Sequence, residues 1–299
     1  MNEADFIALL RPLAGPGGLG LMDDAALLQI PDGQDLVVSS DTMVEGVHFP
    51  MGRIGGGFSE RLLRTALSDL AAKGARPVGY MLNVSWPKDR DPKWLRGFVQ
   101  GLSDAQCAFD CPILGGDTTS GTGPLVASAT VFGHVPAGDM VTRSGARPGH
   151  QVWHTGELGL AEIGLEFVEG RARGHDPSLL HLAEEAYLRP EPRFAFRKPL
   201  RRYASACADI SDGILIDARH IATASRVALN LKGDCVAGKD FGDDYELLFT
   251  ADPDFEKPVR EAAKAIGLPV TLCGEVIAGE GIRVNGEPVA PQGYTHKLD

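Results

Sequence analysis

The sequence predicts a two-domain α/β fold with mixed sheets, and three observations support it. The chain has 299 residues, about twice the roughly 150 residues of a typical domain. Short apolar runs of strand length alternate with longer stretches in which apolar residues recur at helical spacing. A segment rich in proline, glycine and charge, 136–149, separates two such series. We therefore expect an N-terminal domain over residues 1–137 and a C-terminal α/β domain over residues 138–299.

In the N-terminal half, the clearest element is a helix over residues 58–73. Apolar residues recur there at intervals of three and four, and Gly74 follows as a stop signal. Residues 36–38 form an apolar run that leads into the polar residues 39–42, which predicts a strand. The other elements expected in this half are strands at 78–86, 112–114 and 125–135 and a helix at 92–109.

In the C-terminal half, Asn285 and Gly286 predict a β-hairpin, because both residues tolerate the positive φ of a tight turn. The other elements expected here are strands at 151–154, 205–210, 245–250 and 269–276, and helices at 158–169, at 178–188, after Pro192 and at 255–266.

The composition excludes several classes of protein. Lys and Arg number 29 against 40 Asp and Glu, and the net charge of −11 is opposite in sign to that of a nucleic-acid-binding protein. No apolar stretch reaches the roughly 18 residues of a membrane span, and the first residues do not resemble a signal peptide. Five cysteines without a CxxC pair favour neither a disulfide framework nor a zinc site. We expect a cytoplasmic protein that binds neither nucleic acid nor membrane.

Familiar catalytic and phosphate-binding motifs are missing from the sequence. It has no GxxxxGK[ST] P-loop, no protein-kinase HRD and DFG set, no GxSxG elbow and no HExxH. Gly15, Gly17 and Gly20 do match GxGxxG, but the residues before them resemble a helix. A dinucleotide fingerprint needs a strand before the glycines and a helix after them, so we interpret these glycines as a loop.

What recurs instead is an aspartate beside hydroxyl side chains, just past a short apolar run. The three instances are Ser39-Ser40-Asp41-Thr42, Gly116-Asp117-Thr118-Thr119 and Asp209-Ile210-Ser211-Asp212-Gly213. Strand ends are where α/β sheets bind ligands, and carboxylate and hydroxyl oxygens suit Mg²⁺. Each instance taken singly also fits an ordinary turn or helix cap. Their repetition favours a metal site.

Four other polar residues allow two interpretations. Asp69 borders the apolar face of its predicted helix, and Asp23 and Asp24 form an acidic turn. Each of these carboxylates equally fits a solvated surface position. His48 follows the first acidic strand end and, as a lone histidine, also fits a structural role.

Convergence of the carboxylates would require cations. Two unit charges about 6 Å apart repel by roughly 3 kcal/mol at an effective dielectric near 20. A polyphosphate adds to this repulsion, and several divalent ions that bridge protein and phosphate oxygens offset it. The residues therefore predict a magnesium–nucleotide site without a P-loop.

Eight short motifs follow one another along nearly the whole chain. They are Leu-Met-Asp-Asp-Ala-Ala (21–26), Asp-Thr-Met-Val-Glu-Gly-Val-His-Phe (41–49), Leu-Ser-Asp-Leu-Ala-Ala-Lys-Gly-Ala (67–75), Leu-Gly-Gly-Asp-Thr-Thr (114–119), Thr-Arg-Ser-Gly-Ala-Arg-Pro-Gly (142–149), Leu-Arg-Pro-Glu-Pro-Arg (188–193), Asp-Ile-Ser-Asp-Gly (209–213) and Gly-Asp-Asp-Tyr-Glu-Leu-Leu-Phe (242–249). In this order they resemble the thiamine-monophosphate kinase family, of the aminoimidazole-ribonucleotide-synthetase-like superfamily. Any one motif is weak, whereas eight in register are specific.

The resemblance implies that the N-terminal domain binds metal and ATP and that its sheet forms the interface of a homodimer. It implies phosphorylation of thiamine monophosphate to thiamine diphosphate, with ATP as co-substrate and several Mg²⁺ ions. Carried over by position, the metal ligands are Asp24, Ser39, Ser40, Asp41, Asp69, Asp117, Asp209 and Asp212. The nucleotide contacts are Phe109, Gly116, Asp117, Arg143 and Ser211, the substrate contacts are His48, Asp243 and Tyr294, and the catalytic residues are Asp41, Asp212 and Arg143.

The sequence also departs from the family pattern. The stretch between Val227 and Phe241 is shorter than usual. The substituted positions are Met22 for glycine, Ala66 for asparagine, Phe109 for tyrosine, Asp243 for glutamate and Lys297 for an aromatic residue. All the metal carboxylates are retained, so these changes affect substrate contacts more than phosphoryl transfer.

The chemistry that the resemblance implies fits the lack of an obvious general base. The attacking group in thiamine monophosphate is a phosphate oxygen, and a phosphate monoester with a second pKa near 6 is largely dianionic at neutral pH. Alignment of two anions then matters most, and we expect direct in-line transfer without a phosphoenzyme. Two alternatives stay open. One is another ATP-dependent synthetase of the superfamily, and the other is a non-catalytic metal- or ligand-binding descendant.

Overall fold

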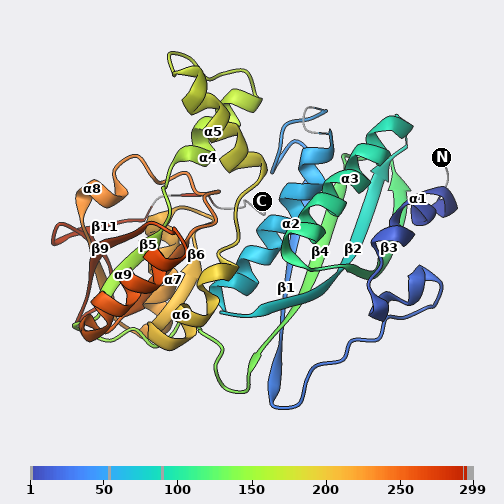
Figure 1. Ribbon diagram of the computed structural model, residues 1–299. Helices are drawn as coiled ribbons and strands as arrows, with labels where there is room; N and C mark the ends of the chain where they lie inside the picture. The colour runs from blue at the N-terminus through green and yellow to red at the C-terminus, as the bar shows by residue number, and fades with distance from the viewer. Residues whose placement is uncertain (1–2, 53–54, 89–90, 292, 295–299) are drawn as a thin grey trace. The chain divides into compact units, whose positions relative to one another are not determined.

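The computed structural model describes residues 3–52, 55–88, 91–291 and 293–294. The chain forms two compact units. The first takes in Met1–Leu70, Arg76–Gly138 and Glu166–Arg173, and the second takes in Ala71–Ala75, Asp139–Leu165 and Gly174–Asp299. Each unit contains a mixed β-sheet with helices packed on it (Figure 1), which confirms the predicted α/β class.

The sheet of the first unit has the strand order β1-β4-β2-β3. Strand β4 pairs antiparallel with both β1 and β2, and β3 runs parallel to β2. The strands are β1 (Gln34–Val44), β2 (Arg76–Pro87), β3 (Ile113–Gly121) and β4 (Val126–Pro136). The helices are α1 (Glu3–Leu10), α2 (Gly55–Ala72) and α3 (Pro92–Phe109), with 3-10 turns η1 (Arg11–Leu13) and η2 (Pro16–Leu21).

Alternation along the strands gives this sheet one covered and one open face. Helices α2 and α3 lie on one face (Figure 1), and α2 buries Phe58 and Leu62 completely. On β1, Val37 points to the covered face and is buried, whereas Leu36 and Val38 are 48% and 51% exposed. The open face therefore carries apolar side chains, and among the described residues no helix covers it.

The sheet of the second unit has the order β11-β10-β7-β9-β5-β8-β6, and β10 with β7 is its parallel pair. The strands are β5 (Gln151–Thr155), β6 (Ala204–Asp209), β7 (Ala228–Leu231), β8 (Leu247–Ala251), β9 (Val270–Ile277), β10 (Gly281–Val284) and β11 (Glu287–Val289). The helical elements are α4 (Leu160–Val168), α5 (Pro177–Leu188), η3 (Phe194–Phe196), α6 (Arg197–Tyr203), α7 (Ile214–Ser225), α8 (Gly233–Val236), η4 (Pro253–Phe255) and α9 (Glu256–Ala265).

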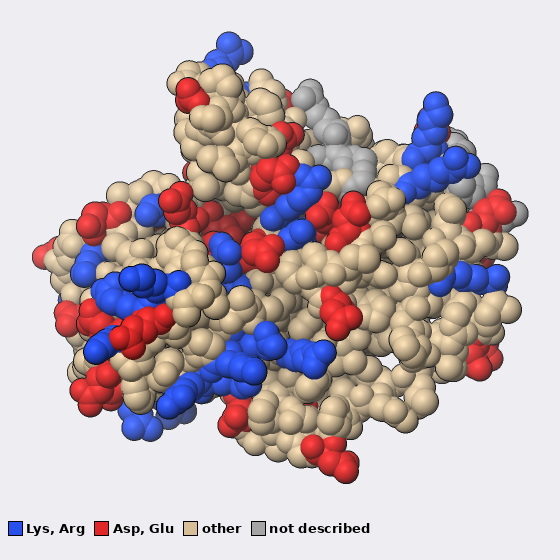
Figure 2. All heavy atoms as spheres, in the orientation of Figure 1, with Lys and Arg blue, Asp and Glu red and all other residues tan. Residues whose placement is uncertain are grey.

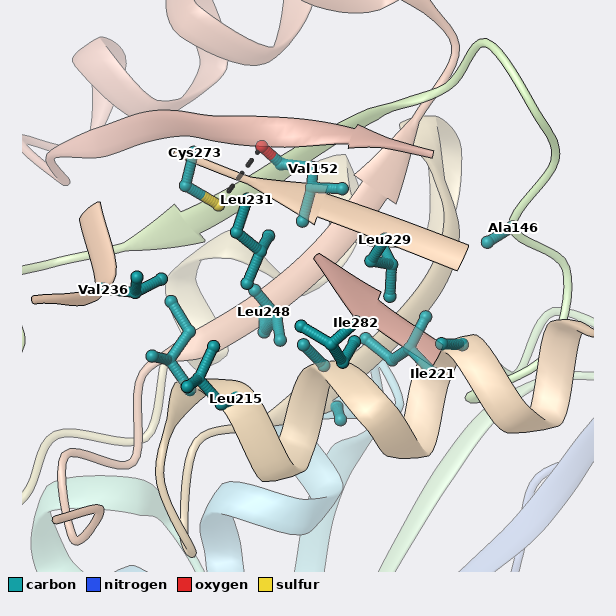
Figure 3. Close-up of a cluster of buried hydrophobic side chains, with 14 of the residues drawn as sticks. Ala146, Val152, Leu215, Ile221, Leu229, Leu231, Val236, Leu248, Cys273 and Ile282 are labelled. Carbon is teal, nitrogen blue, oxygen red and sulfur yellow. Dashed lines mark hydrogen bonds between the residues drawn. The ribbon is translucent and has the colours of Figure 1, made fainter. Parts of the chain in front are cut away.

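Both faces of this second sheet are buried. Val152 belongs to an apolar cluster with Ile221 of α7 and Leu248 of β8 (Figure 3), in which the Cys273 thiol also donates to the Val152 carbonyl. Its neighbour Trp153 belongs to a different cluster, with residues of α6 and α9. Consecutive strand residues point to opposite faces, so helices cover both sides of this sheet.

Several expectations about the elements need correction. Strand β1 continues to Val44 and β3 to Gly121, so the first two acidic motifs lie inside strands and not past their ends. Strand pairing uses backbone groups and accepts polar side chains, which the apolar-run criterion overlooks. Helix α7 and strand β7 were not expected. The helix expected at 58–73 and the Asn285–Gly286 hairpin are confirmed. The GxGxxG glycines fall in and before the 3-10 turn η2.

Candidate active site

The first group of predicted residues lies where β1 crosses α2. Ser39 and Asp41 share the covered face of β1, whereas Ser40 points to the open face and bonds to Thr130 with an oxygen–oxygen distance of 2.9 Å. The Ser39 hydroxyl donates to Asp69 Oδ2 at 2.5 Å. The α2 helix therefore brings Asp69 to the β1 residues from 28 to 30 positions earlier in the sequence.

The carboxylates of Asp41 and Asp69 repel each other. Burial first, and the negative charge of Asp69 second, raise the pKa of Asp41 from 3.8 to about 7. A carboxylate that is costly to ionise in the free protein is one whose charge a bound cation would stabilise. Ser39, Asp41 and Asp69 are oxygen ligands of the kind that Mg²⁺ prefers. The part of the chain that the structure describes contains no group of three or more His, Cys, Asp or Glu side chains arranged to hold a metal.

A second group of predicted residues lines a cavity of about 220 Å³ beside β3. Gly116, Asp117 and Asp24 contribute to its wall, together with Phe6 and Leu10 of α1. Gly116 is required there, because a Cβ would lie 1.8 Å from the carbonyl oxygen of Leu82. Apolar side chains and carboxylates both line the cavity, a combination suited to a ligand with an apolar part and a charged part.

Phe109 and His48 occupy separate positions in the first unit. Phe109 ends α3, half-buried, with the Arg64 guanidinium 5.0 Å from the centre of its ring. His48 follows β1, and its Nδ1 accepts the backbone N–H of Val44 at 3.0 Å. That bond requires an unprotonated Nδ1, so the hydrogen of the neutral imidazole is on Nε2.

In the second unit, the predicted residues gather where β6 passes into α7. Asp209 ends β6 and is 5% exposed. The backbone carbonyl of Ser211 accepts from Asp243 N at 2.9 Å, and that of Asp212 accepts from Tyr294 N at 3.1 Å. Three segments far apart in the sequence therefore meet in one small region.

Sequence reasoning missed the residue that shapes this turn. The carboxylate of Asp217, fully buried in α7, accepts the backbone N–H groups of Ser211 and Asp212 at 3.0 and 3.1 Å. The available signal was an acidic residue in the first turn of a helix, four positions after the Gly213 that ends the Asp-Ile-Ser-Asp-Gly motif.

Arg143 lies elsewhere in the second unit. Its backbone carbonyl accepts from Ser225, at the last residue of α7, whereas Ser211 and Asp212 precede the first residue. A helix of 12 residues is about 18 Å long. The backbone of Arg143 is therefore close to the end of α7 that is far from Ser211.

Comparison with known proteins first gives the class of protein to which the fold belongs. Residues 22–135 match the model of "AIR synthase related protein, N-terminal domain". A thiamine-monophosphate kinase from Caulobacter vibrioides is 40% identical over 99% of this chain and 91% of its own length. The crystal structure of thiamine-monophosphate kinase from Stenotrophomonas maltophilia K279a superposes with a TM-score of 0.84 at 35% identity, covering 95% of this chain and 96% of the other. AaThiL complexed with AMPPCP and TMP superposes with a TM-score of 0.81 at 27% identity, covering 99% and 97%.

The fold is therefore that of the proteins related to AIR synthase. The chain belongs to the thiamine-monophosphate kinase family. Among the described residues, no helix has the length and apolar character needed to cross a membrane.

Proposed function

We propose that the protein transfers the γ-phosphoryl group of ATP to thiamine monophosphate and so produces thiamine diphosphate. The family membership supports this reaction, and so does the relative that was solved with AMPPCP, an ATP analogue, and TMP. Within this chain, the observation that carries the proposal is the repelling pair Asp41 and Asp69 beside the Ser39 hydroxyl. Such a pair fits a role in binding the cations that accompany a polyphosphate.

A magnesium site fits the oxygen ligands of the first unit. We propose Asp41, Asp69 and Ser39 as its centre. The other proposed metal ligands are Asp24 and Asp117 in the first unit, and Asp209 and Asp212 in the second. The Ser40 hydroxyl, bonded to Thr130 on the opposite face of β1, is not part of this centre. Bound Mg²⁺ would offset the charge of the phosphates as the γ-phosphoryl group moves. The protein's own contribution is to hold these oxygens in place before the substrates arrive.

The remaining proposed contacts divide between the two substrates. For the nucleotide they are Phe109, Gly116, Asp117, Arg143 and Ser211. For thiamine monophosphate they are His48, Asp243 and Tyr294. The Asp243 carboxylate suits the positive charge of the thiazolium ring, and the His48 ring is held in place through its Nδ1 by the backbone N–H of Val44. Because the acceptor phosphate is already ionised, none of these residues needs to remove a proton. We propose direct in-line transfer, with Asp41 and Asp212 catalytic through the metal ions.

We also propose a cytoplasmic homodimer in which the domain of residues 1–137 binds metal and ATP and dimerises through its open sheet face. Exposed Leu36 and Val38 on that face support the dimer, and five free cysteines are usual for a reducing compartment. Val38→Asp should produce monomers in light scattering, whereas Leu182→Asp, at a leucine of α5 that is 60% exposed, should not. A Val38→Asp dimer would exclude this face as the interface.

The proposed reaction is tested by ADP release with and without thiamine monophosphate, together with chromatographic identification of the product. We expect ADP and thiamine diphosphate in equal amounts, dependent on Mg²⁺. Release of ADP and inorganic phosphate with no thiamine diphosphate would contradict the proposal and indicate a synthetase-type reaction instead.

A further inference from the structure

One buried charge pair in the second unit has no role in the proposed function so far. Glu246, at the start of β8, is 4% exposed. Its Oε2 accepts from Arg193 Nε at 2.7 Å and from the Thr155 hydroxyl at 2.6 Å, and Arg193 Nη2 donates to Oε1. The Arg193 guanidinium therefore forms hydrogen bonds to both carboxylate oxygens, a bidentate geometry that lysine cannot reproduce.

The surroundings of the Glu246 side chain restrict its carboxylate to a single position. A Cβ at position 156 would lie 1.8 Å from Glu246 Oε1, so the chain passes the carboxylate too closely for any residue other than Gly156 at that position. The Thr155 hydroxyl also accepts from Leu247 N at 2.8 Å. Strand β5, the 188–193 motif and the start of β8 are thus joined at one carboxylate.

This carboxylate anchors a backbone segment of rare conformation. Asp243 and Tyr245 both have left-handed backbones, with φ of 62° and 51°. Non-glycine residues adopt this conformation at a cost in free energy, and two within three positions need support from outside.

The support comes from both sides of the segment. Tyr245 N donates to Ile210 O at 2.9 Å, and Ile210 N donates to Glu246 O at 2.8 Å. Asp244 accepts from Gly159 N at 2.8 Å. The Tyr245 hydroxyl donates to Asp243 Oδ1 at 3.3 Å, and Glu246 is the residue at which this left-handed segment joins β8.

We propose that Arg193 and Glu246 are positioning residues that hold residues 243–246 so that Asp243 meets thiamine monophosphate. This rests on the proposed function, in which Asp243 contacts that substrate. Arg193 and Glu246 act through the backbone and touch neither substrate. Their loss should weaken acceptor binding and leave ATP binding unchanged.

The test is steady-state kinetics of Arg193→Lys and Glu246→Gln, varying one substrate while the other is saturating. We expect KM for thiamine monophosphate to rise about tenfold, with KM for ATP within about twofold of the parent value. Arg260→Lys is the matched control, because Arg260 pairs with Glu256 at an exposed site, and both KM values should stay unchanged. If Arg193→Lys does not fold, Thr155→Ser is the second variant for comparison with Thr155→Val: the serine keeps the hydroxyl that bonds Glu246 and Leu247 N, whereas the valine removes both bonds and should shift KM in the same direction as Glu246→Gln.

An unchanged KM for thiamine monophosphate in folded variants would overturn the proposal. So would equal rises in both KM values with loss of folded protein by circular dichroism, which is the result expected of support for the fold alone. A parent enzyme that releases no ADP with thiamine monophosphate would contradict the proposed function itself, whereas an active parent with unaltered variants would refute only the positioning role.

Discussion

The acidic residues of the two units are balanced in opposite ways. In the first unit, Asp41 lies near Asp69, and the Ser39 hydroxyl donates a hydrogen bond to Asp69. In the second unit, Glu246 is held by a guanidinium and a hydroxyl, and Asp217 by two backbone N–H groups. Carboxylates with partners from the protein fix the backbone around them. On the proposed function, the repelling pair Asp41 and Asp69 is stabilised by a bound cation.

The largest expected effect comes from removing a charge of the repelling pair. Asp41→Asn should lower turnover by about 10²–10³-fold, because an ionised ligand is lost. The metal-free variant should be at least as thermostable as the parent, because the repulsion from Asp69 is removed as well. Kinetics and thermal melts in EDTA measure the two effects, and Asp32→Asn, in an exposed turn, is the control. Full activity in Asp41→Asn would contradict the assignment.

The next effect is on stability, in the second unit. Arg193→Met leaves the buried Glu246 carboxylate without its cation and should lower the free energy of unfolding by about 3 kcal/mol. Arg260→Met breaks an exposed pair and should lower it by less than about 1 kcal/mol. Urea denaturation measures both values. Equal losses of unfolding free energy in the two variants would show that burial does not distinguish the Arg193–Glu246 pair from the Arg260–Glu256 pair.

Substitution of Ser39 should have a smaller effect than substitution of the aspartates. Ser39→Ala removes the donor to Asp69 and should weaken Mg²⁺ affinity about tenfold, with little change in thermal stability. Ser40→Ala, on the opposite face of β1, is the neighbouring comparison. Titration calorimetry with Mg²⁺ and an ATP analogue measures both, and a larger loss from Ser40→Ala would reverse the expected ranking of the two hydroxyls.

The smallest effect is a pH dependence at Asp244. Burial, followed by the charges of Glu246 and Asp243, raises its pKa from 3.8 to about 7, although the backbone N–H groups of Gly159 and Ala161 act in the opposite direction. A raised pKa in the folded state gives stability that is complete below pH 3.8 and is lost as the pH rises to about 7. Asp244→Asn keeps the acceptor for Gly159 and should lack this loss. Melting temperatures from pH 4 to 8 should therefore diverge in favour of the variant, and parallel curves would contradict the raised pKa.

The same contrast explains what the sequence predicts well. The occurrence of hard-oxygen ligands beside apolar runs is a local property, and it predicts Asp41 and Asp209 as metal ligands. The α/β class and the hairpin at Asn285 follow from periodicity and turn chemistry, which are also local. The resemblance to the family extended the set to isolated residues such as Asp243, which no local pattern marks as functional.

Partners that lie far apart in the sequence could not be predicted. Arg193 meets Glu246 across 53 positions, and Thr155 meets it across 91. The lengths of β1 and β3 were underestimated for a related reason, since their polar ends are paired through backbone groups of neighbouring strands. The Arg143 carbonyl contacts Ser225 at the last residue of α7, whereas Asp212 precedes the first residue of that helix.

The central claim is that Asp41 and Asp69 bind a divalent cation together. Electron paramagnetic resonance of Mn²⁺ in the presence of AMPPCP tests it without any turnover, using the parent protein, Asp41→Asn and Asp69→Asn. We expect tight Mn²⁺ binding to the parent and a loss of at least one bound ion in each variant. Identical Mn²⁺ stoichiometry and affinity in all three proteins would contradict the claim and show that the proximity of the two carboxylates does not serve to bind a cation.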